Sequence, residues 1–107
     1  MLPDGRYSAW FKTALAGGVG VLEIANEQLT GRDTVITYSG SFVQDGDTFK
    51  ARVSTKRHSS GQPALLGIDE LDFEFEGTSK STTAVCSGRV RQLPHIALEV
   101  VLVRIEG

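Results

Sequence analysis

The carboxylates of one short segment are the first candidates for chemistry in this chain. Four of them alternate with apolar residues: Glu70, Asp72, Glu74 and Glu76. Paired carboxylates can act as general acid and base or hold a cation, but they must then face a cleft. Alternation instead places all four on the solvated face of a strand, where Lys50, Arg52 and Lys56 of another strand can partly match them. We therefore predict a charged surface here and no active site.

The other reactive side chains form no recognisable catalytic or metal-binding pattern. His58 and His95 are far apart and Cys86 is the single cysteine, so no short metal-ligand spacing occurs. We expect His58 at the surface, His95 in a turn after Pro94, and Cys86 as a buried, inert thiol. No serine lies in a Gly-x-Ser-x-Gly elbow, and residues 17–20 lack the Lys-Ser/Thr of a phosphate loop. We predict no metal, no cofactor and no enzymatic activity.

Length and charge limit the remaining functions. The chain has 107 residues, of which 40% are hydrophobic and 22% charged, as expected for one globular domain spanning 1–107. A formal net charge of −2 gives no basic excess to neutralise a phosphate backbone, so we expect no direct nucleic-acid binding. The apolar run Val100–Val103 is far shorter than the roughly 20 residues of a membrane-spanning helix. With no signal-like N-terminus, we expect a soluble, cytoplasmic protein.

Alternation with period two recurs along the chain and predicts an all-β fold. Asp45-Gly46 is the strongest hairpin signal, and Gly17-Gly18 is read as the first turn. The expected strands are Gly5–Thr13, Val19–Ala25, Gln28–Gly31, Thr34–Val43, Thr48–Lys56, Asp69–Gly77, Thr82–Arg91 and Ile96–Ile105.

Eight short strands joined mostly by tight turns favour an antiparallel up-and-down β-barrel. Inward glycines at 20, 40 and 88 support closure, because strongly curved strands use glycine where they bend. An open two-sheet sandwich is the alternative. The one long connection, His58–Ile68, contains Leu65 and Leu66, and we expect this loop to cover one end of the barrel.

The inward positions of an eight-stranded barrel either fill its interior or leave room for a small ligand. Small inward residues reduce the filling here and aromatic ones make the walls apolar, so we predict a cavity for a lipid-like molecule. The alternative is that the aromatic rings fill the space. The expected lining residues are Tyr7, Ala9, Phe11, Leu22, Ile24, Tyr38, Phe42, Phe49, Val53, Leu71, Phe73, Phe75, Leu98, Val100 and Leu102.

The last strand has apolar residues on both faces, although one barrel core needs only one of them. Contiguous apolar patches on a small domain usually mark an interface, so we predict a homodimer. An edge strand or a covered strand is the alternative explanation. The expected interface residues are Trp10, Val19, Val21, Val101, Val103 and Ile105.

Four stretches of the chain form a recognisable set: Asp4-Gly5-Arg6-Tyr7-Ser8, Gly18-Val19-Gly20-Val21-Leu22-Glu23-Ile24, Leu29-Thr30-Gly31-Arg32-Asp33 and Tyr38-x-Gly40-x-Phe42. Together they resemble the GrlR-like family, which takes its name from a negative regulator of type III secretion genes. The resemblance runs from Asp4 to about Ile105 and includes the 63–65 loop and the closing hydrophobic strand.

This resemblance implies a lipocalin-like eight-stranded barrel with a hydrophobic cavity, a plugging loop and a dimer. It also implies regulation by contact with a transcriptional activator through an acidic loop between two central strands. At the matching position, Gln44-Asp45-Gly46-Asp47, Asp45 and Asp47 are the candidate contact residues. A lipocalin-like carrier or sensor of a small hydrophobic ligand is the second hypothesis. A third is an enzyme that uses the barrel mouth, with Arg104, Arg91 and Tyr38 as its polar candidates.

Overall fold

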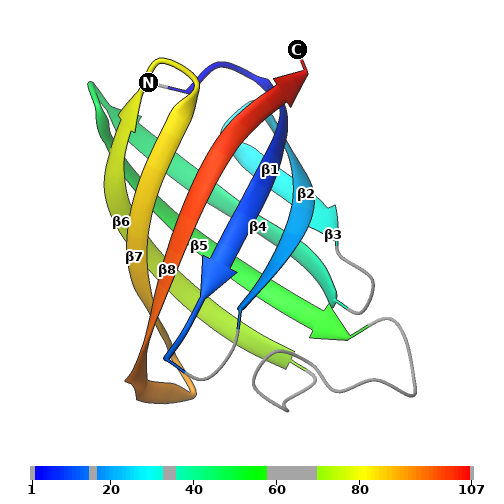
Figure 1. The fold of residues 1–107 in the computed structure, drawn as a ribbon, viewed down its shortest axis with the longest axis vertical. Coiled ribbons are helices and arrows are strands. Elements are labelled where there is room, and N and C mark those ends of the chain that lie inside the picture. Colours follow the sequence, from blue (N-terminus) through cyan, green and yellow to red (C-terminus); the bar gives the residue numbers. More distant parts are fainter. Residues whose placement is uncertain (1, 15–16, 33–35, 58–69, 107) are drawn as a thin grey trace.

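The computed structural model describes residues 2–14, 17–32, 36–57 and 70–106. These residues form eight β-strands and no helix (Figure 1). The strands are β1 (Gly5–Lys12), β2 (Gly17–Ala25), β3 (Gln28–Arg32), β4 (Ile36–Asp45), β5 (Thr48–Arg57), β6 (Glu70–Lys80), β7 (Thr83–Val90) and β8 (Leu93–Glu106).

Each strand pairs antiparallel with the next, and β8 pairs with β1, so the sheet closes into a barrel. The predicted all-β, eight-stranded antiparallel barrel is confirmed, and the open-sandwich alternative is wrong. In Figure 1 the last strand, β8, lies beside the first, β1, and the chain begins and ends at the same end of the barrel. We call this the packed end. We call the opposite end, where β1, β3, β5 and β7 finish, the cavity end.

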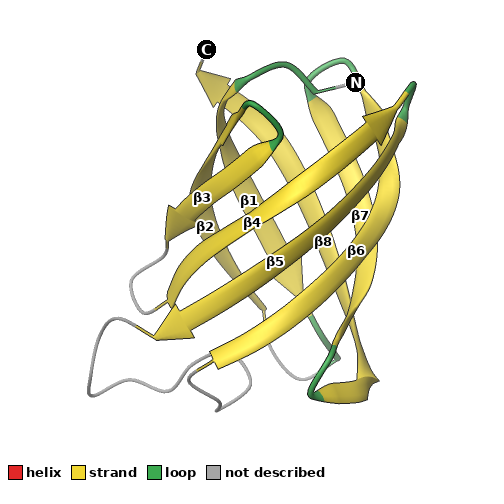
Figure 2. Cartoon of the chain, turned by 180° about the vertical axis from the view of Figure 1, so that it is seen from behind, coloured by secondary structure: helices red, strands yellow, loops and turns green. Residues whose placement is uncertain are grey.

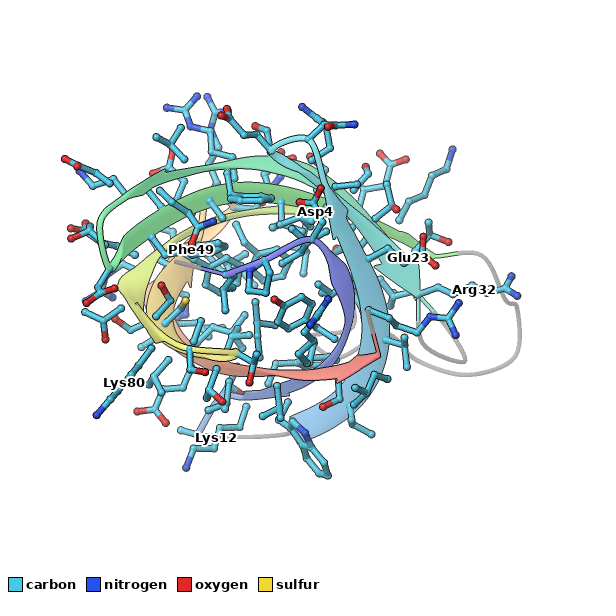
Figure 3. All side chains as sticks on the ribbon, turned by 90° about the horizontal axis from the view of Figure 1, so that it is seen from above. Asp4, Lys12, Glu23, Arg32, Phe49 and Lys80 are labelled. Atoms are coloured by element: carbon cyan, nitrogen blue, oxygen red, sulfur yellow. The ribbon has the colours of Figure 1, made fainter. Side chains whose placement is uncertain are left out.

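Strict alternation positions the side chains on the two faces. In the view along the barrel, Phe49 lies within the ring of strands, whereas Lys12, Glu23, Arg32 and Lys80 project outward (Figure 3). This follows from the period of two, because successive strand residues point to opposite faces.

Two inward glycines allow neighbouring strands to approach closely. A Cβ atom at Gly40 would collide with the Arg52 carbonyl oxygen, and one at Gly88 would collide with that of Glu74. A side chain at either position would therefore push the two paired strands apart. This agrees with the use of glycine where strongly curved strands bend.

The predicted hairpin at Asp45-Gly46 is present, displaced by one residue. Asp45 pairs with Thr48, so the two-residue loop is Gly46-Asp47, with Gly46 at φ 60°. Asn26 and Glu27 form the preceding β2–β3 loop with φ values of 52° and 63°. Positive φ at both positions of the Asn26-Glu27 loop is a geometry that matches the twist of paired strands.

Two predicted turns are wrong. Gly17 and Gly18 belong to β2, where they pair with Lys12 and Phe11, so the glycine pair continues the ladder instead of reversing it. Pro94 and His95 lie inside β8, which begins earlier than expected. Proline fits there because it lies near the start of the strand, next to a register shift at Arg89/Val90.

Figure 2 shows β5 and β6 side by side, and their outer face carries the charged ladder that alternation indicates. Arg52 Nε lies 3.6 Å from Glu74 Oε1, and Lys50 and Lys56 are in register with Glu76 and Glu70. These acids face solvent in β6, as expected. Exposed pairs of this kind add little stability, so the ladder serves mainly as a solvated surface.

Asp72, in the same ladder, accepts hydrogen bonds from two uncharged side chains. Ser54 Oγ donates to its Oδ1 at 2.7 Å, and Gln92 Nε2 donates to its Oδ2 at 3.0 Å. These hydrogen bonds, that of Ser54 first, lower the pKa of the Asp72 carboxyl from its usual value. Hydrogen bonds to a carboxylate stabilise its charged form.

Three expectations fall on other residues. The covering loop at His58–Ile68, the surface position of His58 and the first residues of the strand at Thr34–Val43 lie outside the described residues. Within the described residues, no helix is long and apolar enough to cross a membrane.

Candidate ligand cavity and outer surfaces

The packed end of the barrel is closed by large side chains. Tyr7 is fully buried, and Ile24, Phe42 and Leu2 join it in one core cluster. The Phe42 and Phe49 rings stack with centroids 5.2 Å apart. Burial of this much aromatic and aliphatic surface is the main stabilising contribution at this end.

The N-terminal segment holds that closure in place through its backbone. Leu2 N–H donates to Gln44 Oε1 at 2.6 Å, while Gln44 Nε2 donates to the Leu2 carbonyl at 3.1 Å. Tyr7 Oη donates to the Pro3 carbonyl at 2.6 Å, and an Arg104 guanidinium nitrogen donates to the Asp4 carbonyl at 2.9 Å. We call residues 2–4 the strap. Because its polar groups are paired, the strap can bury Leu2 against the core.

The cavity end contains unfilled space. A cavity of about 90 Å³ lies inside the barrel, and Phe49, Leu29, Ile36 and Leu71 are among its lining residues. Native cores have few voids larger than a water molecule, so this volume exceeds what ordinary core packing leaves. The full set of described lining residues is Ala9, Phe11, Leu22, Leu29, Ile36, Tyr38, Phe49, Ala51, Val53, Thr55, Leu71, Phe73, Phe75, Cys86, Leu98, Val100 and Leu102.

The buried residues around the cavity belong to three clusters. Ile36 and Tyr38 form one, Leu71, Phe73 and Leu98 belong to a second, and Phe49 belongs to the cluster that also contains Tyr7. Partly buried Phe11 and Val53 contact the first two of these clusters. Together the three clusters surround the cavity without filling it.

Three residues expected to line the cavity do not. Tyr7, Ile24 and Phe42 are buried in the cluster at the packed end and are not among the residues that line the cavity. Their inward direction is as predicted, but alternation gives the face of a side chain and not its height along the barrel axis.

Sequence reasoning also missed five lining residues: Leu29, Ile36, Ala51, Thr55 and Cys86. Each of the five continues, or lies next to, a stretch of its strand in which apolar and polar residues alternate. Counting every inward position as lining, small residues included, would have found Ala51, Thr55 and Cys86.

Among the described lining residues, Cys86 has a clearly displaced pKa. It is buried, and desolvation raises the pKa of its thiol to about 11. A thiol in apolar surroundings stays protonated at neutral pH, which makes it a poor nucleophile. Burial at the packed end likewise raises the pKa of the Tyr7 hydroxyl, against the opposing effect of the Arg104 charge.

The outer face of β7, β8, β1 and β2 carries a continuous apolar row. Val85 pairs with Val101, Val101 with Trp10, and Trp10 with Val19, so the row crosses four strands. Trp10 is 56% exposed, and its Nε1–H donates to Ser8 Oγ at 3.2 Å. The indole donor is thus satisfied, and the exposed ring contributes apolar surface.

The next row extends this patch. Val103 and Val21 flank Ser8, and Ile105 is exposed near the end of β8. Val85 is the member that sequence reasoning missed. We call the whole set the apolar face: Trp10, Val19, Val21, Val85, Val101, Val103 and Ile105. Mixed charge borders it at both ends, where Lys12 Nζ lies 3.5 Å from Glu99 Oε2 and an Arg6 guanidinium nitrogen 3.2 Å from Glu23 Oε1.

The acidic turn between β4 and β5 lies at the packed end. Asp45 and Asp47 are both exposed there. The Asp47 carbonyl accepts hydrogen bonds from Ser79 N–H at 2.8 Å and Ser79 Oγ at 3.5 Å. The turn is therefore anchored to β6 through its backbone, with both carboxylates at the surface.

The polar residues considered for an enzyme do not converge. Arg104 lies at the packed end beside the strap, Arg91 follows β7 at the cavity end, and Tyr38 is buried within the barrel. Among the described residues no group of three His, Cys, Asp or Glu side chains is placed to hold a metal ion.

The fold and the cavity define a small, closed, antiparallel β-barrel with an apolar interior space. No family model matches the chain, and no curated protein sequence matches it significantly. The cavity and the two outer surfaces are therefore the features that indicate a function.

Proposed function

We propose that this protein is a non-enzymatic binding protein that holds a small apolar molecule inside its barrel. The cavity of about 90 Å³ carries the proposal, because the described residues around it include no charged side chain. Apolar cavities of this kind exclude water and take up apolar guests instead. In this respect the barrel works as a lipocalin-like carrier or sensor, and the segment at 58–68 is its candidate cover.

Ligand uptake is tested by filling the space with protein. In the wild type, toluene is expected to shift the methyl signals of Val53, Leu71 and Leu98 in a saturable way. Ala51→Leu places three extra carbon atoms in the cavity and is expected to abolish the shifts. Val43→Leu, on the outer face, is the matched control that retains binding. Absence of saturable binding in the wild type would overturn the proposal.

The apolar face supports a second element of the proposal, association of two copies of the chain. A two-fold dimer uses the same patch on both subunits, and tryptophan is a frequent anchor of such interfaces. The mixed-charge pairs at both ends supply a polar rim without one dominant sign, so a second copy meets no like-charge barrier.

Sedimentation equilibrium tests the dimer with a matched pair of variants. The wild type is expected to be dimeric at micromolar concentration, and Trp10→Asp monomeric. Val43→Asp carries the same charge at a valine that is 64% exposed outside the apolar face, and is expected to leave the dimer intact. A monomeric wild type, or equal effects of both variants, would contradict this interface.

The resemblance to the GrlR-like family supports a regulatory role through protein contact, with a transcriptional activator as the candidate partner. The exposed carboxylates of Asp45 and Asp47 are the candidate contact. Reversing both charges is expected to weaken capture of a defined partner from the native host. Glu27→Lys, on the neighbouring β2–β3 turn, is the control. Capture that is unaltered by reversal at 45 and 47 would exclude this contact.

A further inference from the structure

Two of the residues that line the cavity carry a hydroxyl group, Tyr38 and Thr55, and that of Thr55 lies on an aliphatic side chain within the otherwise apolar wall. Thr55, on β5, is 9% exposed and lies in register between Tyr38 of β4 and Leu71 of β6. All three residues line the cavity. Valine has the same shape as threonine and would suit this wall better, since a buried hydroxyl loses its hydration. The presence of threonine therefore calls for a hydrogen-bonding explanation.

The protein itself uses this hydroxyl poorly. Thr55 Oγ1 donates to the Leu71 carbonyl at 3.5 Å, the long limit for such a bond. A hydroxyl has one donor and two acceptor positions, and among the described residues the Thr55 side chain makes this one hydrogen bond. The Thr55 hydroxyl oxygen can therefore still accept a hydrogen bond at the wall of the cavity, where β5 lies between β4 and β6.

The neighbouring rings indicate what shape of molecule fits beside it. Phe11 packs edge-on against Tyr38, with centroids 5.9 Å apart, and Phe73 stacks on Phe75 at 5.7 Å. Aromatic walls of this kind favour a flat ring as guest. Because no described lining residue is charged, an ionised head group would have no compensating partner.

We propose that the natural ligand is a neutral ring compound with one hydroxyl group, a phenol or a cyclic alcohol, whose O–H donates to Thr55 Oγ1. This inference rests on the proposed function, since it presupposes that the cavity binds a small molecule. It assigns Thr55 as the residue that determines specificity between hydroxylated and purely apolar guests.

Phenol and toluene provide the test, because they differ by a hydroxyl in place of a methyl group. Affinities for both are measured by methyl chemical-shift titration on the wild type, Thr55→Val and Thr55→Ser. Thr55→Val is expected to weaken phenol about 3- to 10-fold, the value of one hydrogen bond, and to leave toluene unchanged. Thr55→Ser, which keeps the hydroxyl, is expected to retain phenol affinity. Thr37→Val, exposed on the outer face of β4, is the control and should alter neither ligand.

The possible failures are distinguishable. If the wild type binds toluene but Thr55→Val changes both affinities by the same factor, or neither, the role of Thr55 is overturned and the cavity proposal stands. If Thr55→Ser loses phenol as fully as Thr55→Val, the hydroxyl is again not the determinant. If the wild type binds neither compound, the proposed function fails and this inference fails with it.

Discussion

The two ends of the barrel are built from the same alternating pattern but differ in how completely they are filled. At the packed end, the strap, Tyr7 and Phe42 form a single core cluster with Phe49. Around the cavity, two further clusters and part of the first one, Phe49 included, leave space between them. Hydrophobic alternation is therefore enough to specify a closed sheet, whereas side-chain size and the strap decide where the interior is solid.

This difference predicts that the packed core contributes more to stability than the side chains around the cavity. Close packing makes a core sensitive to the loss or gain of even one methylene group, so paired substitutions at the two ends measure the difference directly.

The largest expected effect comes from truncating one phenylalanine at each end. Phe42→Ala leaves a void in the packed core and is expected to cost about 3–5 kcal/mol of unfolding free energy. Phe73→Ala removes a ring that already faces empty space, so its cost should be smaller by about 1 kcal/mol or more. Urea denaturation of both variants measures the two values. Equal losses would show that the two ends are packed alike.

Enlarging one alanine that lines the cavity and one that does not tests the same difference from the opposite direction. Ala84 is fully buried away from the cavity, so Ala84→Leu overpacks the core and should cost about 1–3 kcal/mol. Ala51 lines the cavity, so Ala51→Leu can fill existing space and should be close to neutral or stabilising. Thermal unfolding of the pair measures this, and an Ala51→Leu variant as unstable as Ala84→Leu would argue against unfilled space.

Releasing the strap should have a moderate effect confined to the packed end. Gln44→Ala removes two hydrogen bonds to the Leu2 backbone and is expected to cost about 1–2 kcal/mol, with faster hydrogen exchange at the Leu2 amide. Gln28→Ala, at an exposed position of β3, is the control. Unchanged exchange at Leu2 would mean that the strap does not depend on Gln44.

The smallest effect concerns the Cys86 thiol, which reports on water in the cavity. Its pKa of about 11 lies above the ordinary value of 9.0 because the site is desolvated. Between about pH 9 and pH 11 the folded state therefore keeps the thiol proton that the unfolded state loses. The contribution of Cys86 to the free energy of unfolding is complete below about pH 9 and is lost as the pH rises towards 11. Ultraviolet titration of the thiolate is expected to show this value. A titration midpoint near 9 would indicate a water-filled cavity.

Much of this fold could be predicted from the sequence, for a definable reason. Period-two alternation depends only on the chemistry of neighbouring residues, so the inward faces of β5 and β6 and the hairpin at Gly46 were predictable. The Gly17-Gly18 pair was misread as a turn because glycine suits both a turn and a strand that approaches its neighbour closely. Pro94 was misread for the opposite reason, since a bulge lets proline enter a strand near its start.

The candidate site was less predictable because it depends on three-dimensional packing. Tyr7 and Thr55 are both inward residues in the sequence pattern, yet one closes the packed end and the other faces the cavity. The strap contacts Tyr7 at the packed end through the Pro3 carbonyl. The hydrogen bond that holds the strap, between Leu2 and Gln44, joins residues 42 positions apart. Register across four strands was likewise needed to add Val85 to the apolar face.

A crystal of the protein under xenon pressure tests the central claim most directly. Xenon binds to dry apolar cavities and scatters X-rays strongly, so it marks unfilled interior space without requiring the natural ligand. A xenon peak surrounded by Ala51, Phe73 and Leu98, with none beside Tyr7, is the result this account predicts. A barrel that takes up no xenon, with its phenylalanine rings closed across the space, would contradict it.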